Sequence, residues 1–298
     1  METIELEQIA RTQFLKDVTQ PYQWSEEYVY QLLTQAEREA CKRASLILDK
    51  TTQTSDNVAT GTVTSTTTSK LIDTNATFTA DMVGYTVYNS TDNTWAVITA
   101  LDSPTIVSIS ADIMVSGEAY AIGDASKALT RVCVESGTSE YTLSDKVIKI
   151  ERCYLSSRGK QYPLKQELQV NSNAVGVPMW YTEEKKLLTL FPTPDATVNS
   201  GTGIDTLNLE VYRLPLTDLS GVDGQTPEID DEYHFDLIHY ACYLAYSKQD
   251  VDTQDMSKAL WHEAQFEKKF GRKMTANEET ILRKMPSDFQ LGTKSFGI

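Results

Sequence analysis

The sequence is poor in cysteine and has no long apolar run. Its four cysteines are scattered over 298 residues without a closely spaced pair, which indicates neither a zinc motif nor a disulfide framework. We expect reduced thiols and folding in a cytoplasm. No apolar run approaches the ~20 residues that a membrane-spanning helix needs, and the N-terminus lacks the basic and apolar regions of a secretion signal. The sequence predicts a soluble protein without a membrane contact.

Basic residues are also scarce. The chain carries 27 Lys and Arg against 42 Asp and Glu, which gives a formal net charge of −15 at pH 7. Proteins that grip nucleic acid use clustered Lys and Arg, whose contacts with phosphates release counterions. This charge balance argues against tight DNA binding, but it suits a wall along which DNA slides.

Catalytic motifs are absent, and three histidines leave few candidates for acid–base chemistry. The sequence contains no G-x-S-x-G elbow, no glycine-rich phosphate loop and no H-E-x-x-H motif. A metal site would need His234, His239 and His262 to meet, but His234 and His239 lie five residues apart and point in different directions on a helix. Paired carboxylates could serve a glycosidase, yet 42 acidic residues produce pairs by chance. We therefore predict no catalytic residue, metal ligand or cofactor.

Apolar residues recur at helical spacing near the N-terminus. One helix is predicted over residues 4–17. A second begins after Ser25, a good N-cap, and its apolar stripe continues to Asp49, which makes it about 25 residues long. The opposite face carries charged side chains that we expect to be solvated: Glu37, Arg38, Glu39, Lys42 and Arg43.

Two longer helices and a short one are predicted near the C-terminus. Thr226-Pro227 is typical of an N-cap followed by proline at the first helical position. The chain then turns at residues 249–255, Asp255 caps the next helix, and Gly271 ends it. Residues 275–278 can form a capping box for the last helix. The predicted core stripe of the first helix of this group is His234, Leu237, Ile238, Ala241, Cys242 and Ala245.

The middle of the chain favours β-structure. Residues 52–126 are rich in Thr, Ser, Asn and Val, with one basic residue, Lys70, and eight acidic ones. Six short alternating runs recur there at intervals of roughly 8–12 residues, and we expect a strand at each: residues 62–64, 70–72, 86–88, 95–98, 105–109 and 119–122. We predict an α+β fold. Residues 1–51 plus 127–285 form a helical bundle of about four main helices with a β-unit, residues 52–126 an inserted small antiparallel barrel or sandwich, and residues 286–298 a separate C-terminal segment.

Aromatic residues gather in the predicted helices. Tyr240, Tyr243 and Tyr246 cannot all share the face of Leu237 and Ala241, so some of them face another surface. Aromatic side chains are enriched at protein interfaces, which favours a contact between subunits; packing on the chain's own β-unit is the alternative. The candidates for a subunit interface are Trp24, Tyr28, Tyr30, Tyr240, Tyr243 and Tyr246.

The last residues are too few and too interrupted by glycine to build a core, yet they include apolar side chains. Terminal segments are usually polar, so apolar anchors suggest a segment that becomes ordered on a partner. Folding back onto its own domain is the alternative. The anchors are Met285, Phe289, Leu291, Phe296 and Ile298.

Two parts of the chain resemble the head–tail connector, or adaptor, proteins of tailed bacteriophages, the tail tubular protein A-like family. The N-terminal part carries Trp24-Ser25-Glu26-Glu27 at the start of a helix and residues 36–40 within it. The C-terminal part is the more specific one. It carries Tyr233-His234, the tract 243–250, Asp252-Thr253, and Phe266-Glu267 before Phe270-Gly271.

The resemblance implies a structural protein rather than an enzyme. It implies a homo-oligomeric ring, a dodecamer, that docks beneath the portal protein and carries tail, nozzle or tail-completion proteins, while DNA passes through without sequence-specific binding. The implied location is the neck of the virion, after assembly in the host cytoplasm. Residues 285–298 would be the portal-docking arm, and residues 52–126 an outward or tail-facing attachment surface.

Two other functions remain open. The β-rich residues 52–126 could bind or cleave carbohydrate, as some phage proteins do. An enzyme that holds a metal between His234, His239 and His262 is the third hypothesis.

Overall fold

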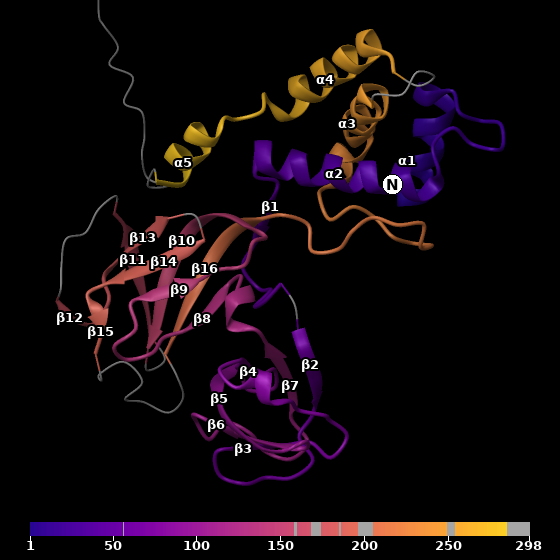
Figure 1. Ribbon diagram of the computed structural model, residues 1–298. Coiled ribbons are helices and arrows are strands. Elements are labelled where there is room, and N and C mark those ends of the chain that lie inside the picture. Colours follow the sequence, from indigo (N-terminus) through magenta and orange to yellow (C-terminus); the bar gives the residue numbers. More distant parts are fainter. Residues whose placement is uncertain are drawn as a thin grey trace, which may run out of the picture. The chain divides into compact units, whose positions relative to one another are not determined.

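The structure is a computed structural model that describes residues 1–55, 57–157, 160–167, 174–184, 186–195, 205–248 and 254–284. The chain divides into two compact units. Of the described residues, 1–48 and 212–276 belong to the helical unit, and 49–211 and 277–284 belong to the β unit. Figure 1 shows the helices and strands of both.

The helical unit is formed by the two ends of the chain. Helix α1 (Thr3–Ile9) continues as a π-helix, Ala10–Leu15, and is followed by α2 (Glu26–Ala44), α3 (His234–Ser247) and α4 (Met256–Phe270). Helix α3 packs against α1, α2 and α4. Its predicted core stripe is buried as expected, and the same core includes Leu6, Ala10, Val29, Leu33, Ala36, Ala259 and Phe266. A short helix, α5 (Ala276–Lys284), follows α4.

Several predicted helix ends are confirmed. The side chain of Ser25 accepts a hydrogen bond from the backbone N–H of Tyr28 at the start of α2, and Asp255 accepts one from the N–H of Lys258 at the start of α4. Gly271 ends α4 with a φ of +86°, a left-handed conformation that glycine adopts without a steric penalty.

The second helix is shorter than predicted. Helix α2 ends at Ala44, because Ser45 takes a left-handed conformation, and Ile47–Asp49 form strand β1 instead of continuing the apolar stripe. The expectation of a solvated face was also wrong at two positions, since Glu37 and Arg43 are buried. Periodicity locates a buried face but does not exclude burial of a charged side chain that finds partners.

The predicted helix start at Thr226-Pro227 was wrong. A short 3-10 helix, Asp231–Tyr233, precedes α3, which begins at His234. The backbone N–H groups of Glu228 and Ile229 donate to the carboxylate of Glu37 on α2. These groups are therefore satisfied by a distant side chain, and the segment after Pro227 needs no helical turn.

The β unit contains an eight-stranded sheet. Its order is β1-β16-β10-β11-β13-β14-β9, and β8 pairs with β16. The strands beyond β1 are β8 (Arg131–Cys133), β9 (Glu140–Thr142), β10 (Val147–Ser157), β11 (Lys160–Gln166), β13 (Trp180–Glu184), β14 (Leu187–Phe191) and β16 (Thr206–Arg213). The pair β11–β13 is parallel. A separate parallel pair joins β12 (Val175–Gly176) and β15 (Thr193–Pro194).

A second sheet lies within the predicted insertion. It is an antiparallel half-barrel of six strands in the order β2-β7-β4-β5-β6-β3. Five of the six predicted runs coincide with strands, while the first, residues 62–64, overlaps only the end of β2. The strands are β2 (Asn57–Thr62), β3 (Lys70–Ile72), β4 (Thr86–Asn89), β5 (Thr94–Ser103), β6 (Ile106–Ile109) and β7 (Ala119–Gly123), with a 3-10 turn, Ala80–Met82, before β4.

One glycine of this half-barrel is required by its surroundings. The hydroxyl of Tyr120 donates to Asp73 at 2.9 Å, and both side chains approach the backbone of Gly61. A Cβ atom on residue 61 would lie 2.4 Å from Oδ2 of Asp73, so only glycine fits. The surrounding core consists of buried apolar residues from all parts of the sheet, including Leu71, Phe78, Val87, Ile98, Val107, Met114 and Ile122.

The predicted α+β class is confirmed, with most elements being strands. All four cysteines are free, as expected, and burial raises the pKa of Cys242 and Cys133 to about 12. Among the described residues, no helix is long and apolar enough to cross a membrane.

Candidate functional site

Three of the aromatic residues predicted at a subunit interface are buried within the helical unit. Trp24, Tyr240 and Tyr246 are all nearly inaccessible to solvent. The rings of Trp24 and Tyr246 meet edge to face with centroids 6.1 Å apart, and Tyr240 packs on Phe266 at 4.8 Å. The hydroxyl of Tyr246 donates to the carbonyl of Phe14 at 2.8 Å. These residues fix the packing of the helices on one another.

The other three candidates are half-buried. Tyr28 lies under the ammonium group of Lys248, and Tyr243 packs on Tyr240 with centroids 5.4 Å apart. Tyr30 lies so close to Gly221 that a Cβ there would be 3.0 Å from its ring. Each has an exposed part on the helical unit, so contact with another subunit stays a prediction for these residues.

A group of exposed apolar side chains lies on α3 and α4, and none of them was among the predicted site residues. Phe235 is 40% exposed and Trp261 is 52% exposed. Their rings contact the ring of His239 from two sides, with centroids 6.2 and 5.6 Å away. Met256 and Leu260, one turn apart on α4, are about half exposed as well. The sequence could have indicated the exposure of Met256, Leu260 and Trp261, because they do not share the helix face of the buried Ala259, Phe266 and Phe270.

Beneath Trp261 lies a buried pair of histidines. The Nδ1 atoms of His239 and His262 are 3.1 Å apart, a hydrogen bond that requires one ring to donate and the other to accept. Phe14 contacts both rings, at 5.3 and 5.4 Å. Burial lowers the pKa of both histidines, that of His262 to about 4 with further effects of His239 and Lys258. Both rings are therefore neutral near pH 7.

The third histidine does not join this pair. His234 contacts the carbonyl of Ile229 through Nε2 at 2.8 Å and the N-terminal residue through Nδ1. Within the described ranges, no three His, Cys, Asp or Glu side chains are grouped so that they could hold a metal ion. The hypothesis of a metal between His234, His239 and His262 thus has no geometry to support it in the described chain.

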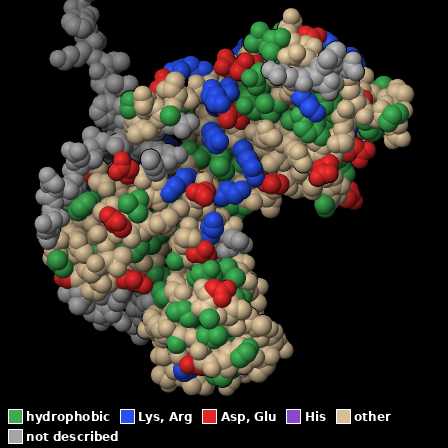
Figure 2. Space-filling model, viewed as in Figure 1, with side chains coloured by type: hydrophobic (Ala, Val, Ile, Leu, Met, Phe, Trp, Pro, Cys, Tyr) green, Lys and Arg blue, Asp and Glu red, His purple; other side chains and the backbone are tan. Residues whose placement is uncertain are grey.

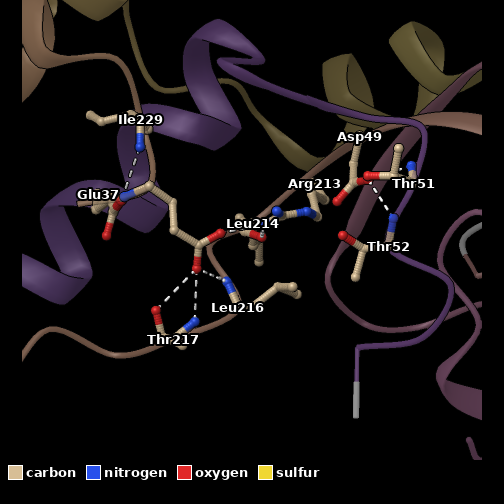
Figure 3. Close-up of polar contacts among 10 residues, drawn as sticks. Glu37, Asp49, Thr51, Thr52, Arg213, Leu214, Leu216, Thr217 and Ile229 are labelled. Carbon is tan, nitrogen blue, oxygen red and sulfur yellow. Dashed lines mark hydrogen bonds and ion pairs between the residues drawn. The ribbon is translucent and has the colours of Figure 1, made fainter. Parts of the chain in front are cut away.

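A polar cluster fastens the loop before α3 to helix α2 (Figure 3). The buried carboxylate of Glu37 accepts from the N–H of Glu228 at 2.6 Å and of Ile229 at 3.4 Å. Its second oxygen has no hydrogen-bond partner. Burial raises the pKa of Glu37 to about 7, although the two backbone hydrogen bonds act in the other direction.

The side chain of Glu228 completes this cluster. It accepts from Arg213 at 2.6 Å and from the N–H groups of Leu216 and Thr217 (Figure 3). Burial alone would raise the pKa of Glu228, but these hydrogen bonds and the charge of Arg213 hold it below its ordinary value. The hydrogen bonds of this cluster anchor the loop before α3 to helix α2.

Basic side chains gather where helices of this unit end. Figure 2 shows Lys and Arg side chains on this face of the molecule, and α2 and α4 carry Lys42, Arg43, Lys268 and Lys269 in their last turns. Cations there interact favourably with the helix dipoles. The predicted arm residues Met285, Phe289, Leu291, Phe296 and Ile298 lie outside the described residues.

Comparison with the models of known protein families identifies a related family. The model of a protein family described as SU10 adaptor protein matches residues 111–285, which is more than half of the chain. The match begins before β7, covers every strand of the eight-stranded sheet except β1, and continues to the end of α5. No curated protein matches the sequence.

Proposed function

The chain belongs to the SU10 adaptor protein family, a family of phage head–tail adaptors, and from this we propose that it forms a dodecameric ring that docks beneath the portal and carries the tail. The family match over residues 111–285 is the observation that carries the proposal. The family is a structural one, which implies that the protein is not an enzyme and is located at the head–tail junction of the virion. Portal and tail proteins are the partners that this membership implies.

We assign each part of the chain a role in the ring. The helical unit, as a bundle of four main helices, forms the ring body around the DNA channel. Residues 286–298, with Met285, form the arm that reaches the portal through Phe289, Leu291, Phe296 and Ile298. The predicted insertion, residues 52–126, provides the attachment surface for tail proteins. The net charge of −15 lets DNA pass along the channel without adhering to it.

Exposed aromatic side chains on α3 and α4 support a lateral contact between copies. Phe235 and Trp261 present large apolar areas to solvent, whereas aromatic residues that stay exposed in a monomer are typical of interfaces. A ring is built from a heterologous interface, in which this surface meets a different surface of the next copy. The half-buried Tyr28, Tyr30 and Tyr243 are candidates for that second surface.

The proposal is tested by mixing the purified full-length chain with the portal protein of the same phage and imaging the mixture by negative-stain electron microscopy. We expect a second ring with twelve-fold symmetry stacked on the portal ring. A chain that stays monomeric and adds no density to the portal would overturn the proposal.

A truncated chain tests the arm separately. Removal of Ser287–Ile298 should leave the thermal unfolding of the chain unchanged, because this segment is too short and too interrupted by glycine to build a core, and should abolish attachment to the portal. Attachment by the truncated chain would contradict the role of the arm and leave the ring itself in place.

A further inference from the structure

The β unit contains a cavity of about 290 Å³ where the half-barrel meets the eight-stranded sheet. Strand β5 contacts β8 there, and the 3-10 turn Ala125–Lys127 contacts β9. Trp95 and Val97 of β5 line one side, and Arg131 of β8 with Thr142 of β9 lines the other. Segments from four parts of the chain thus build one pocket that is open to solvent on one side.

Arg131 is the only cation among the described residues that line this cavity. Its side chain is partly buried, and burial lowers its pKa, which shows that the guanidinium group has lost part of its hydration. Nη1 donates to the neighbouring carbonyl of Thr130 at 2.9 Å. A guanidinium group has five N–H donors, and in the described part of the chain no carboxylate forms an ion pair with it. A desolvated charge without a counter-ion is unfavourable.

Apolar side chains form another part of the pocket lining. Trp95 is almost entirely buried, and its ring packs on Tyr88 with centroids 4.4 Å apart. Val97 and Val132 also line the pocket, together with the polar side chains of Thr86, Ser126 and Thr142. A pocket of this kind holds an apolar body against the indole and directs a polar group towards the guanidinium.

Two acidic residues at the cavity limit which anion fits. Glu135 and Glu140 line it with exposed side chains. A ligand with several negative charges, such as a phosphate, would be repelled by both. A single carboxylate, which the planar guanidinium can bind through two parallel hydrogen bonds, is the anion with the least repulsion.

We propose that this cavity is a binding site for a single carboxylate carried on an apolar body, with Arg131 as its counter-ion and Trp95 as its apolar wall. The carboxylate comes either from a free apolar acid or from an acidic side chain of a partner polypeptide flanked by apolar residues. Both sources present the same chemistry to Arg131, and experiment separates them.

Isothermal titration of the full-length chain tests the proposal. The probes are phenylacetate and an acetylated, amidated Phe-Asp-Leu peptide, and the matched controls are phenylacetamide and the corresponding Phe-Asn-Leu peptide. We expect saturable binding of the acids and at least tenfold weaker binding of the amides. A peptide that binds more than tenfold tighter than phenylacetate identifies a partner polypeptide, and the reverse order identifies a free acid. No saturable binding of either acid, or equal binding of acid and amide, overturns the proposal.

Variants locate the site. Arg131→Gln should weaken binding of the acid at least tenfold. Arg131→Lys should weaken it less, because lysine keeps the positive charge but cannot form the two parallel hydrogen bonds of a guanidinium group. Lys127→Gln is the control, since it removes a neighbouring cation that does not line the cavity. Unchanged affinity in both Arg131 variants overturns the assignment. Thermal unfolding shows whether Arg131→Gln is folded; if it is not, Arg131→Lys and the amide comparison in the wild type decide.

Discussion

Glu37 is a carboxyl group on which burial and hydrogen bonding act in opposite directions. Its side chain is fully buried, and burial dominates, so its pKa rises from 4.5 to about 7. The folded chain therefore keeps this proton to a higher pH than the unfolded chain does. By linkage, Glu37 contributes stability that is present below about pH 4.5 and is lost as the pH rises through about 7.

Glu37→Gln should remove this loss. Glutamine keeps an oxygen that accepts from the N–H of Glu228 but cannot ionise. At pH 8 we expect the free energy of unfolding to exceed that of the wild type by on the order of 3 kcal/mol, since each pKa unit corresponds to about 1.4 kcal/mol. At pH 4 the two proteins should be equally stable. Urea unfolding at several pH values measures this.

Glu39→Gln is the matched control on the same helix. Glu39 pairs with Arg43 at 2.9 Å, and its loss should lower stability without changing the fall between pH 4.5 and 7. If the free energy of unfolding of Glu37→Gln fell between pH 4.5 and 7 as much as that of the wild type, the ionisation of Glu37 would not be its cause.

The buried pair of His239 and His262 makes stability depend on pH in the opposite way to Glu37. Burial, His239 and Lys258 lower the pKa of His262 from 6.5 to about 4, so the folded chain takes up this proton later than the unfolded chain. Its contribution to stability is present above about pH 6.5 and is lost as the pH falls through about 4. Wild-type stability thus combines two opposite slopes within one range of pH.

His262→Gln separates the two slopes. Glutamine can keep a hydrogen bond to His239 and has no charge to gain, so the variant should lose less stability than the wild type between pH 6.5 and 4. Thermal unfolding across this range is the measurement. His234→Gln serves as the control, because His234 lies apart from the pair, and a fall in His262→Gln as steep as in the wild type would exclude the pair as its source.

At the scale of elements, the sequence correctly predicted the helix starts at which a side chain caps the first turn. Ser25 and Asp255 each satisfy a free N–H at the first turn of a helix, and a single residue is enough to predict this. The chain near Pro227 has equally good local signals, but Glu37, almost two hundred residues away, takes its N–H groups. A prediction from neighbouring residues cannot include a contact over this distance in the sequence. The helix was therefore predicted to begin at Pro227, whereas it begins at His234.

Helix α4 has two kinds of large apolar residue, and they should respond differently to truncation. Phe266 is fully buried and packs on Tyr240 and Phe270, so Phe266→Ala should lower the free energy of unfolding by about 3–5 kcal/mol. Trp261 is half exposed, so Trp261→Ala should cost about 1 kcal/mol or less but reduce ring formation.

Urea unfolding of the monomer and mass measurement of the assembled ring distinguish the two effects. A Trp261→Ala chain that forms rings as well as the wild type would remove α4 from the lateral contact. Leu260→Ala, next to it and equally exposed, reports whether the contact extends along the helix.

At the scale of the whole molecule, class and order of elements could be predicted because each depends on periodicity and composition. The short alternating runs of residues 70–122 were sufficient to locate five strands of the half-barrel. The cavity at Arg131 could not be predicted, since β5, β8 and β9 meet there through tertiary contacts. The exposed face of α4, with Trp261, could have been predicted from the helical spacing of Ala259, Phe266 and Phe270, which are buried on the other face.

The acidic balance predicts how assembly depends on salt. Copies with a net charge of −15 repel one another as they approach, and raising the ionic strength from about 0.01 M to 0.15 M shortens the Debye length from about 30 Å to about 8 Å. We expect the fraction of chain in rings, measured by mass photometry, to rise over this range. A fall instead would indicate that ion pairs between copies dominate the contact.

The chain enters the half-barrel through β2 and leaves it through β7, and these two strands are neighbours in the sheet. Asn57 at the start of β2 pairs with Gly123 at the end of β7, and just outside them Thr54 bridges to Ala128. Both ends of the module therefore meet at one point, where a short peptide could close the chain if the module were missing.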